Sequence, residues 1–93
     1  MAISLAQRTE QLRAEQQLLK KADTDIEDGW QRIHAQEVRV REFQTSGHDA
    51  QQAERLVDLL KETLVQWERH RTLIIQRVDF LQHEVDSAIP ANN

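Results

Sequence analysis

Apolar residues recur at every seventh position through the second half of the chain. This first line has no polar member, and it consists of Ala53, Leu60, Trp67, Ile74, Leu81 and Ala88. A second line with the same period is interrupted only by Arg71, and it consists of Val57, Leu64, Val78 and Val85. Two apolar lines of this period form the seam of a coiled coil. We therefore predict a long helix over residues 49–88.

The first half of the chain carries a matching apolar line. It consists of Leu5, Leu12, Leu19, Ile26, Ile33 and Val40. Ser4 is followed three residues later by Gln7, which is the pattern of a capping box and favours a helix that starts near Leu5. We predict that this helix extends over residues 5–44.

Turn-forming residues gather between the two predicted helices, at positions 45–48. Gly47 suits the left-handed conformation that closes a helix, and Asp49 is a suitable N-cap for the second helix. Pro90 disfavours a helical conformation in the residue before it, so we expect a frayed tail over residues 90–93. All 93 residues then belong to one helical domain.

The register of the two helices can be tested by arithmetic. In an antiparallel hairpin, the position numbers of facing residues add up to a constant. A constant of 93 pairs the two apolar lines along their whole length: Val40 with Ala53, Ile33 with Leu60, Ile26 with Trp67, Leu19 with Ile74, Leu12 with Leu81, and Leu5 with Ala88. The midpoint falls between Ser46 and Gly47, within the turn. We therefore predict an all-α fold, a long antiparallel two-helix hairpin with arms of about 60 Å.

The second layer of this hairpin is less apolar. The first helix faces the second apolar line with four residues that are poor apolar partners, namely Arg8, Glu15, Gly29 and Gln36. Further apolar residues of the second helix lie off its seam: Leu56, Leu59, Leu73, Ile75 and Phe80. We expect the second helix to carry more apolar surface than the first can cover. Such an excess favours a partner, either a second copy that completes a four-helix bundle or another helical protein.

Gly29 and Trp30 form a second candidate interaction site. Glycine lowers helix stability unless another group needs the space of the missing side chain. We therefore consider a close approach of another helix at this pair. Packing of Trp30 over Leu64 inside the hairpin is the alternative.

Arg71 is the only charged residue in the two seam lines of the second helix. It faces Ala22, and Asp25 lies one turn away. We predict that Asp25 receives the charge of Arg71 and that this polar pair fixes the register and the number of partners.

The acidic run at residues 23–28 and the four histidines are candidate metal ligands. The run does not fit a calcium-binding loop, because Asp28 stands where the loop needs Gly and His34 stands where it needs Glu. No histidine lies three or four residues from another: the four are His34, His48, His70 and His83. We predict surface or seam-edge roles for them and no metal site.

Composition narrows the class of protein. The absence of Cys excludes disulfides and thiolate metal sites, and the net charge of −4 argues against a phosphate-binding surface. The sequence has no catalytic nucleophile motif and no glycine-rich phosphate loop, so we predict no enzymatic activity, cofactor or small-molecule substrate. It has neither a signal sequence nor a run of about 18 apolar residues. We therefore expect a cytoplasmic protein without a membrane partner.

These features favour a non-enzymatic protein–protein interaction module, such as a small coiled-coil adaptor, assembly factor or chaperone-like subunit that self-associates through its second helix. The alternative is a regulatory protein that contacts nucleic acid, or a nucleic-acid-binding partner, through Arg39 and Arg41. Glu37 and Glu42 interleave with these arginines, however, which is typical of a solvated helix face. A metal carrier built on the acidic run and the histidines is a third hypothesis.

Overall fold

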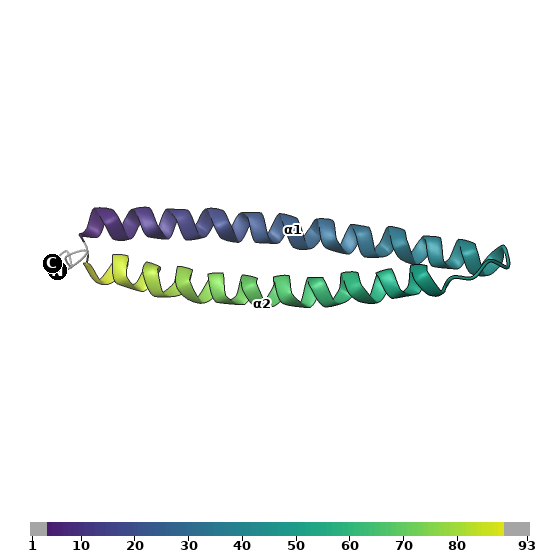
Figure 1. Cartoon of the computed structure of the whole chain (residues 1–93). Helices are drawn as coiled ribbons and strands as arrows, with labels where there is room; N and C mark the ends of the chain where they lie inside the picture. Colours follow the sequence, from purple (N-terminus) through teal and green to yellow (C-terminus); the bar gives the residue numbers. More distant parts are fainter. Residues whose placement is uncertain (1–3, 89–93) are drawn as a thin grey trace.

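The computed structural model describes residues 4–88, which form two helices. Helix α1 spans Leu5–Thr45 and helix α2 spans Gln51–Ala88. Figure 1 shows the two helices lying side by side and antiparallel, with the turn at one end and both ends of the described chain at the other. The predicted helical hairpin is confirmed. The predicted tail at residues 90–93 lies outside the described residues.

The start of α1 has the predicted capping box. The Gln7 N–H donates to Ser4 Oγ at 3.2 Å, and the Ser4 N–H donates to Gln7 Oε1 at 3.0 Å. These bonds satisfy backbone N–H groups that have no partner within the helix. The helix therefore begins at Leu5, as the sequence predicts.

The end of α1 depends on Gly47, whose φ of 77° lies in the left-handed region. The Gly47 N–H donates to the Gln44 carbonyl and the His48 N–H donates to the Phe43 carbonyl, a pair of bonds that closes many helices before a left-handed glycine. Helix α2 starts two residues later than predicted. Asp49 precedes it, and its carboxylate accepts a hydrogen bond from the Gln51 N–H at 2.9 Å.

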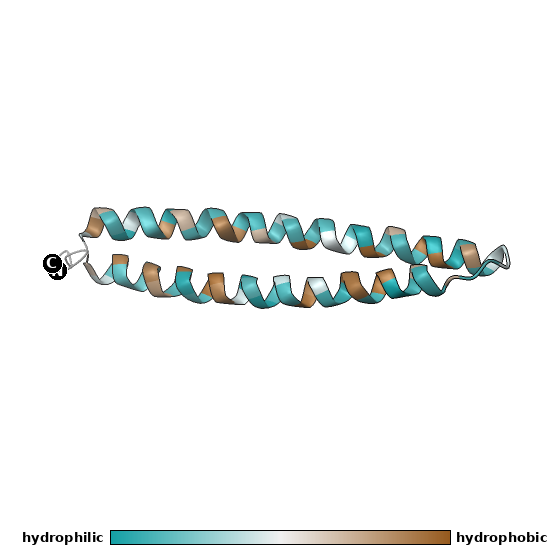
Figure 2. Ribbon diagram, viewed as in Figure 1, coloured by the Kyte–Doolittle hydropathy of each residue, from teal (hydrophilic) through white to brown (hydrophobic). Residues whose placement is uncertain are grey.

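The core is one seam between α1 and α2. Two isoleucines, Ile33 and Ile74, are almost completely buried, each with 1% of its surface exposed. The other buried apolar residues are Leu12, Ala50, Ala53, Val57, Leu64 and Val85. Figure 2 shows how apolar and hydrophilic segments alternate along both helices. Apart from Ala50, every buried residue belongs to one of the apolar lines in the sequence.

Contacts across the seam follow the predicted register. A Cβ atom at Gly29 would lie 2.9 Å from Leu64 Cδ1, and these two residues are a predicted facing pair. Three ion pairs cross the seam within one residue of the same register: Arg8 with Glu84, Glu15 with Arg77, and Asp23 with Arg71.

The second apolar line of α2 is covered better than its polar facing residues indicate, with Val78 half-buried, whereas the expected apolar excess of α2 lies off the seam at Leu59, Leu73 and Phe80. Val57, Leu64 and Val85 are buried within the hairpin. Arg8 and Glu15 lie opposite this line, and only 25% and 17% of their side-chain surfaces are exposed. Long charged side chains can bury their aliphatic stems while their charged ends reach a partner. The polar residues of α1 therefore cover part of the apolar line as well as carrying charge.

Candidate interaction surface

The most exposed apolar residues of α2 share one line on its outer side. Leu59, Leu73 and Phe80 have 58%, 56% and 62% of their surfaces exposed. The spacing follows the seven-residue period, with Gln66 at the intervening position, so the three side chains share one side of the helix. We call Leu59, Leu73 and Phe80 the outer line. The outer line lies off the seam and is not covered by α1.

The other predicted interaction residues lie elsewhere. Leu56 is 42% exposed and lines a hollow between the helices, whereas Ile75 is half-buried. Trp30 is exposed on α1. Gly29 is not available to another helix, because Leu64 and the ring of Trp67 fill the space beside it. The suggested intermolecular approach at Gly29 is therefore wrong, and the close approach takes place within the chain.

Arg71 lies in the seam and contacts the acidic run, but its partner is not the predicted one. Its Nε donates to Asp23 Oδ1. Asp25 instead accepts from Lys21 Nζ at 2.7 Å, one turn away on the same helix. The role assigned to Asp25 as the partner of Arg71 is therefore wrong. Asp23 takes that place because it directly follows Ala22, the residue that faces Arg71 in the predicted register.

Two further ion pairs join the helices nearer the chain ends. Arg8 donates to Glu84, and Glu15 Oε2 lies 3.4 Å from Arg77 Nε. Glu15 Oε2 is buried and has no hydrogen-bond partner, so its contact with Arg77 is a charge contact without a well-formed hydrogen bond.

In the first pair α1 carries the positive charge, on Arg8, and in the second pair it carries the negative charge, on Glu15. This arrangement favours one register. A slip of one heptad in one direction would bring Arg8 toward Arg77. The opposite slip would bring Glu15 toward Glu84. Each slip places like charges together, and this raises the free energy of the wrong alignment.

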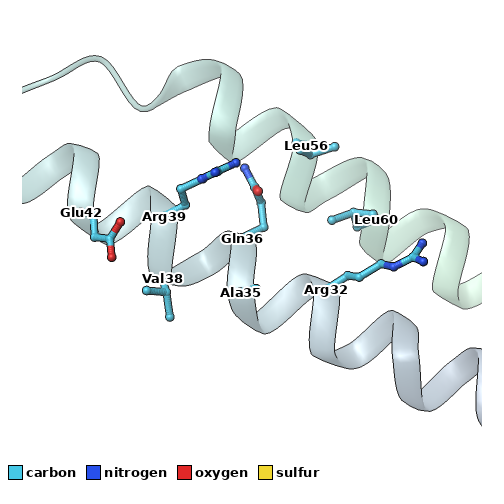
Figure 3. A pocket seen from close by; sticks show the side chains of 8 residues that line it. All are labelled: Arg32, Ala35, Gln36, Val38, Arg39, Glu42, Leu56 and Leu60. Atoms are coloured by element: carbon cyan, nitrogen blue, oxygen red, sulfur yellow. The ribbon is translucent and has the colours of Figure 1, made fainter.

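A hollow of about 540 Å³ lies between the helices near the turn. Its lining consists of Arg32, Ala35, Gln36, Val38, Arg39, Glu42, Leu56 and Leu60. Figure 3 shows Arg32, Gln36 and Arg39 extending from α1 toward the helix that carries Leu56 and Leu60. The apolar pattern of the sequence does not predict this hollow, although Arg32 and Arg39 are separated by one heptad and so share a side of α1.

Arg39 and Arg41 do not form one basic surface. Residues two apart in a helix point in different directions. Arg39 lines the hollow with Leu56, whereas Arg41 lines a separate depression with Val40 and Val57.

Residues 4–88 were also searched for metal ligands and for membrane-spanning helices. Within that range no three His, Cys, Asp or Glu side chains lie close enough together to hold a metal ion. Neither described helix carries an apolar stretch sufficient to cross a membrane. Comparisons with protein-family models, with curated proteins and with solved structures found no match to this chain.

Proposed function

We propose that this protein is a non-enzymatic interaction module, a small coiled-coil adaptor or assembly factor that self-associates through α2. One observation supports this function above the others: Leu59, Leu73 and Phe80 are each more than half exposed and share one line of the helix. Single exposed apolar residues are common on proteins, but aligned ones mark an interaction surface.

A second copy is the partner that this surface suits. The outer line repeats with the period of a coiled-coil seam, so another helix with the same period packs along it without a change in backbone. Two hairpins joined in this way form a four-helix bundle around a two-fold axis. The cytoplasmic location stays a prediction from the sequence.

The test is the solution mass of a double variant, Leu73→Gln with Phe80→Gln, measured by light scattering. Replacing two apolar contacts with amides removes the apolar area that stabilises the dimer. We expect a dimer for the unmodified chain and a monomer for the variant at the same concentration.

A matched control removes two exposed apolar residues outside the outer line, through Leu18→Gln with Val65→Gln. Leu18 and Val65 are 45% and 46% exposed. We expect this control to remain a dimer, and circular dichroism should show unchanged helix content in both variants. Equal loss of the dimer in both variants would contradict self-association through the outer line.

A further inference from the structure

The turn-proximal hollow combines an apolar floor with free positive charge. Leu56 and Leu60 of α2 form its apolar side, and Arg32 and Arg39 extend toward them from α1 (Figure 3). Gln36 lies between the two arginines in sequence and also lines the hollow. The site therefore presents two cationic groups, one heptad apart, along one apolar groove.

Neither arginine has an ionic partner among the described residues. Every ion pair across the seam of residues 4–88 uses other basic residues, namely Arg8, Arg71 and Arg77. Around the hollow, α2 contributes only Leu56 and Leu60, which cannot accept a hydrogen bond from a guanidinium through their side chains. Glu42 is the single acidic residue of the lining, and no contact within 4.0 Å joins it to either arginine.

Flanking charges of a coiled coil determine which helix it accepts as a partner. Within the described range 4–88, no carboxylate forms an ion pair with the flanking residues Arg32 and Arg39. We propose that the hollow binds an acidic amphipathic helix of another protein. Its apolar residues pack on Leu56 and Leu60, and its carboxylates accept paired hydrogen bonds from Arg32 and Arg39.

A nucleic acid fits the hollow less well than an acidic helix. Phosphate binding requires a concentration of Lys and Arg, whereas this lining has two arginines, one glutamate and an apolar floor. A groove between two helices also has the shape that accepts a third helix. Leucines of a bound helix would remove Leu56 and Leu60 from water, whereas a phosphate backbone would leave them exposed to solvent.

This partner rests on the proposed role as an interaction module, but it uses different residues from self-association. Leu56 and Leu60 lie inside the hollow, whereas Leu59, Leu73 and Phe80 lie on the outer line. The two interactions can therefore be lost separately.

The test uses a fluorescent synthetic helix of about three heptads. The probe has leucines along one stripe and glutamates beside them, and a second probe has lysines in place of the glutamates. We expect the full chain to bind the glutamate probe at least about tenfold more tightly than the lysine probe in fluorescence anisotropy. The double variant Arg32→Gln with Arg39→Gln should lose about tenfold or more of that affinity.

A matched control removes the same charge elsewhere, through Arg55→Gln with Arg69→Gln. Both arginines are exposed on α2 and lie outside the hollow, so we expect an affinity change of less than about threefold, due only to screened long-range charge. Glu42→Gln should tighten binding of the glutamate probe about two- to threefold, because it removes a like charge from the lining.

Three results would overturn the acidic-helix proposal. The first is equal binding of the glutamate and lysine probes. The second is an unchanged affinity in Arg32→Gln with Arg39→Gln while the variant keeps its helix content. The third is a combined result: the unmodified chain does not bind the glutamate probe, and the Arg32→Gln with Arg39→Gln variant no longer dimerises. That result would show that a second copy of the chain occupies the hollow. Self-association is judged separately, because the Leu73→Gln and Phe80→Gln variant should still bind the glutamate probe.

Discussion

The two halves of the hairpin are held together in different ways. The terminal half, residues 4–27 with 67–88, contains all the ion pairs of the described chain, including the three that cross the seam. The turn half, residues 28–66, contains most of the buried apolar residues: Ile33, Ala50, Ala53, Val57 and Leu64. In the terminal half, ion pairs of Arg8, Glu15 and Arg71 join the two helices. In the turn half, close apolar packing joins them.

This difference suggests separate roles for the two halves: ion pairs in the terminal half fix the register, and arginines in the turn half are available for binding. Near the turn, the short connection already limits how far the helices can slip, so arginines there are free for other roles. Far from the turn, opposite charges at Arg8 and Glu15 discriminate against a slip. Accordingly, no ion pair within residues 4–88 involves Arg32 or Arg39, which line the hollow, whereas Arg8, Arg71 and Arg77 are paired.

The largest expected effect comes from removing either of the two most buried side chains. Ile33→Ala in the turn half and Ile74→Ala in the terminal half should each lower the free energy of unfolding by about 3 kcal/mol, because each leaves a cavity in the seam. Urea denaturation followed by circular dichroism measures both. A loss below about 1 kcal/mol in one half only would show that this half is not well packed.

The close approach in the turn half predicts a reversal of sign in a double-mutant cycle. Gly29→Ala should lower stability by about 1 kcal/mol, because its Cβ would lie 2.9 Å from the buried Leu64 side chain. In the Leu64→Ala background the same change should raise stability by about 1 kcal/mol, since alanine favours helix over glycine. Thermal and urea unfolding of the four proteins measure the cycle, and equal effects in both backgrounds would refute the contact.

Arg71→Leu sharpens the comparison by making the terminal seam apolar. The Arg71 and Asp23 side chains are 40% and 53% exposed, so their ion pair contributes little to stability. Leucine in the seam should raise the free energy of unfolding by about 1 kcal/mol and broaden the distribution of oligomeric masses, because a constraint on register is lost. If the thermal midpoint and the mass both stay unchanged, Arg71 does not set register.

The smallest expected effect concerns salt. Arg8→Ala should lower the free energy of unfolding by about 0.5–1 kcal/mol at low ionic strength, since it removes a partly buried ion pair with Glu84. The difference should shrink in about 1 M salt, where charges are screened beyond about 3 Å. Arg32→Ala, which removes no ion pair in the described chain, should show almost no salt-dependent change. Parallel urea titrations test this contrast, and an equal salt response of both variants would contradict it.

The sequence predicts the hairpin and its register because both depend on the seven-residue period of its apolar residues, which matches the repeat of the helical backbone. The capping box at Ser4 and the left-handed Gly47 are predictable for another reason, because each depends on the types of a few residues close together in the sequence. Helix α2 starts two residues later than the sequence predicts, because an aspartate at position 49 can accept from a helical N–H without being the residue directly before the helix.

Predictions failed where they depended on the reach of side chains. The pattern identified Arg71 as a seam residue, but it did not distinguish Asp23 from Asp25 as its partner, because both lie within one turn of Ala22. It treated Arg8 and Glu15 as gaps in the apolar layer, since it ignored their aliphatic stems. The hollow was missed because it is formed by side chains from both helices that converge only in three dimensions.

The most direct test of the central claim is the solution mass of the unmodified chain by light scattering across a dilution series. If the outer line joins two copies, the mass should approach twice the 10.9 kDa of one chain at high concentration and fall toward one chain on dilution, with helix content retained. A well-folded monomer at every concentration would contradict self-association through Leu59, Leu73 and Phe80.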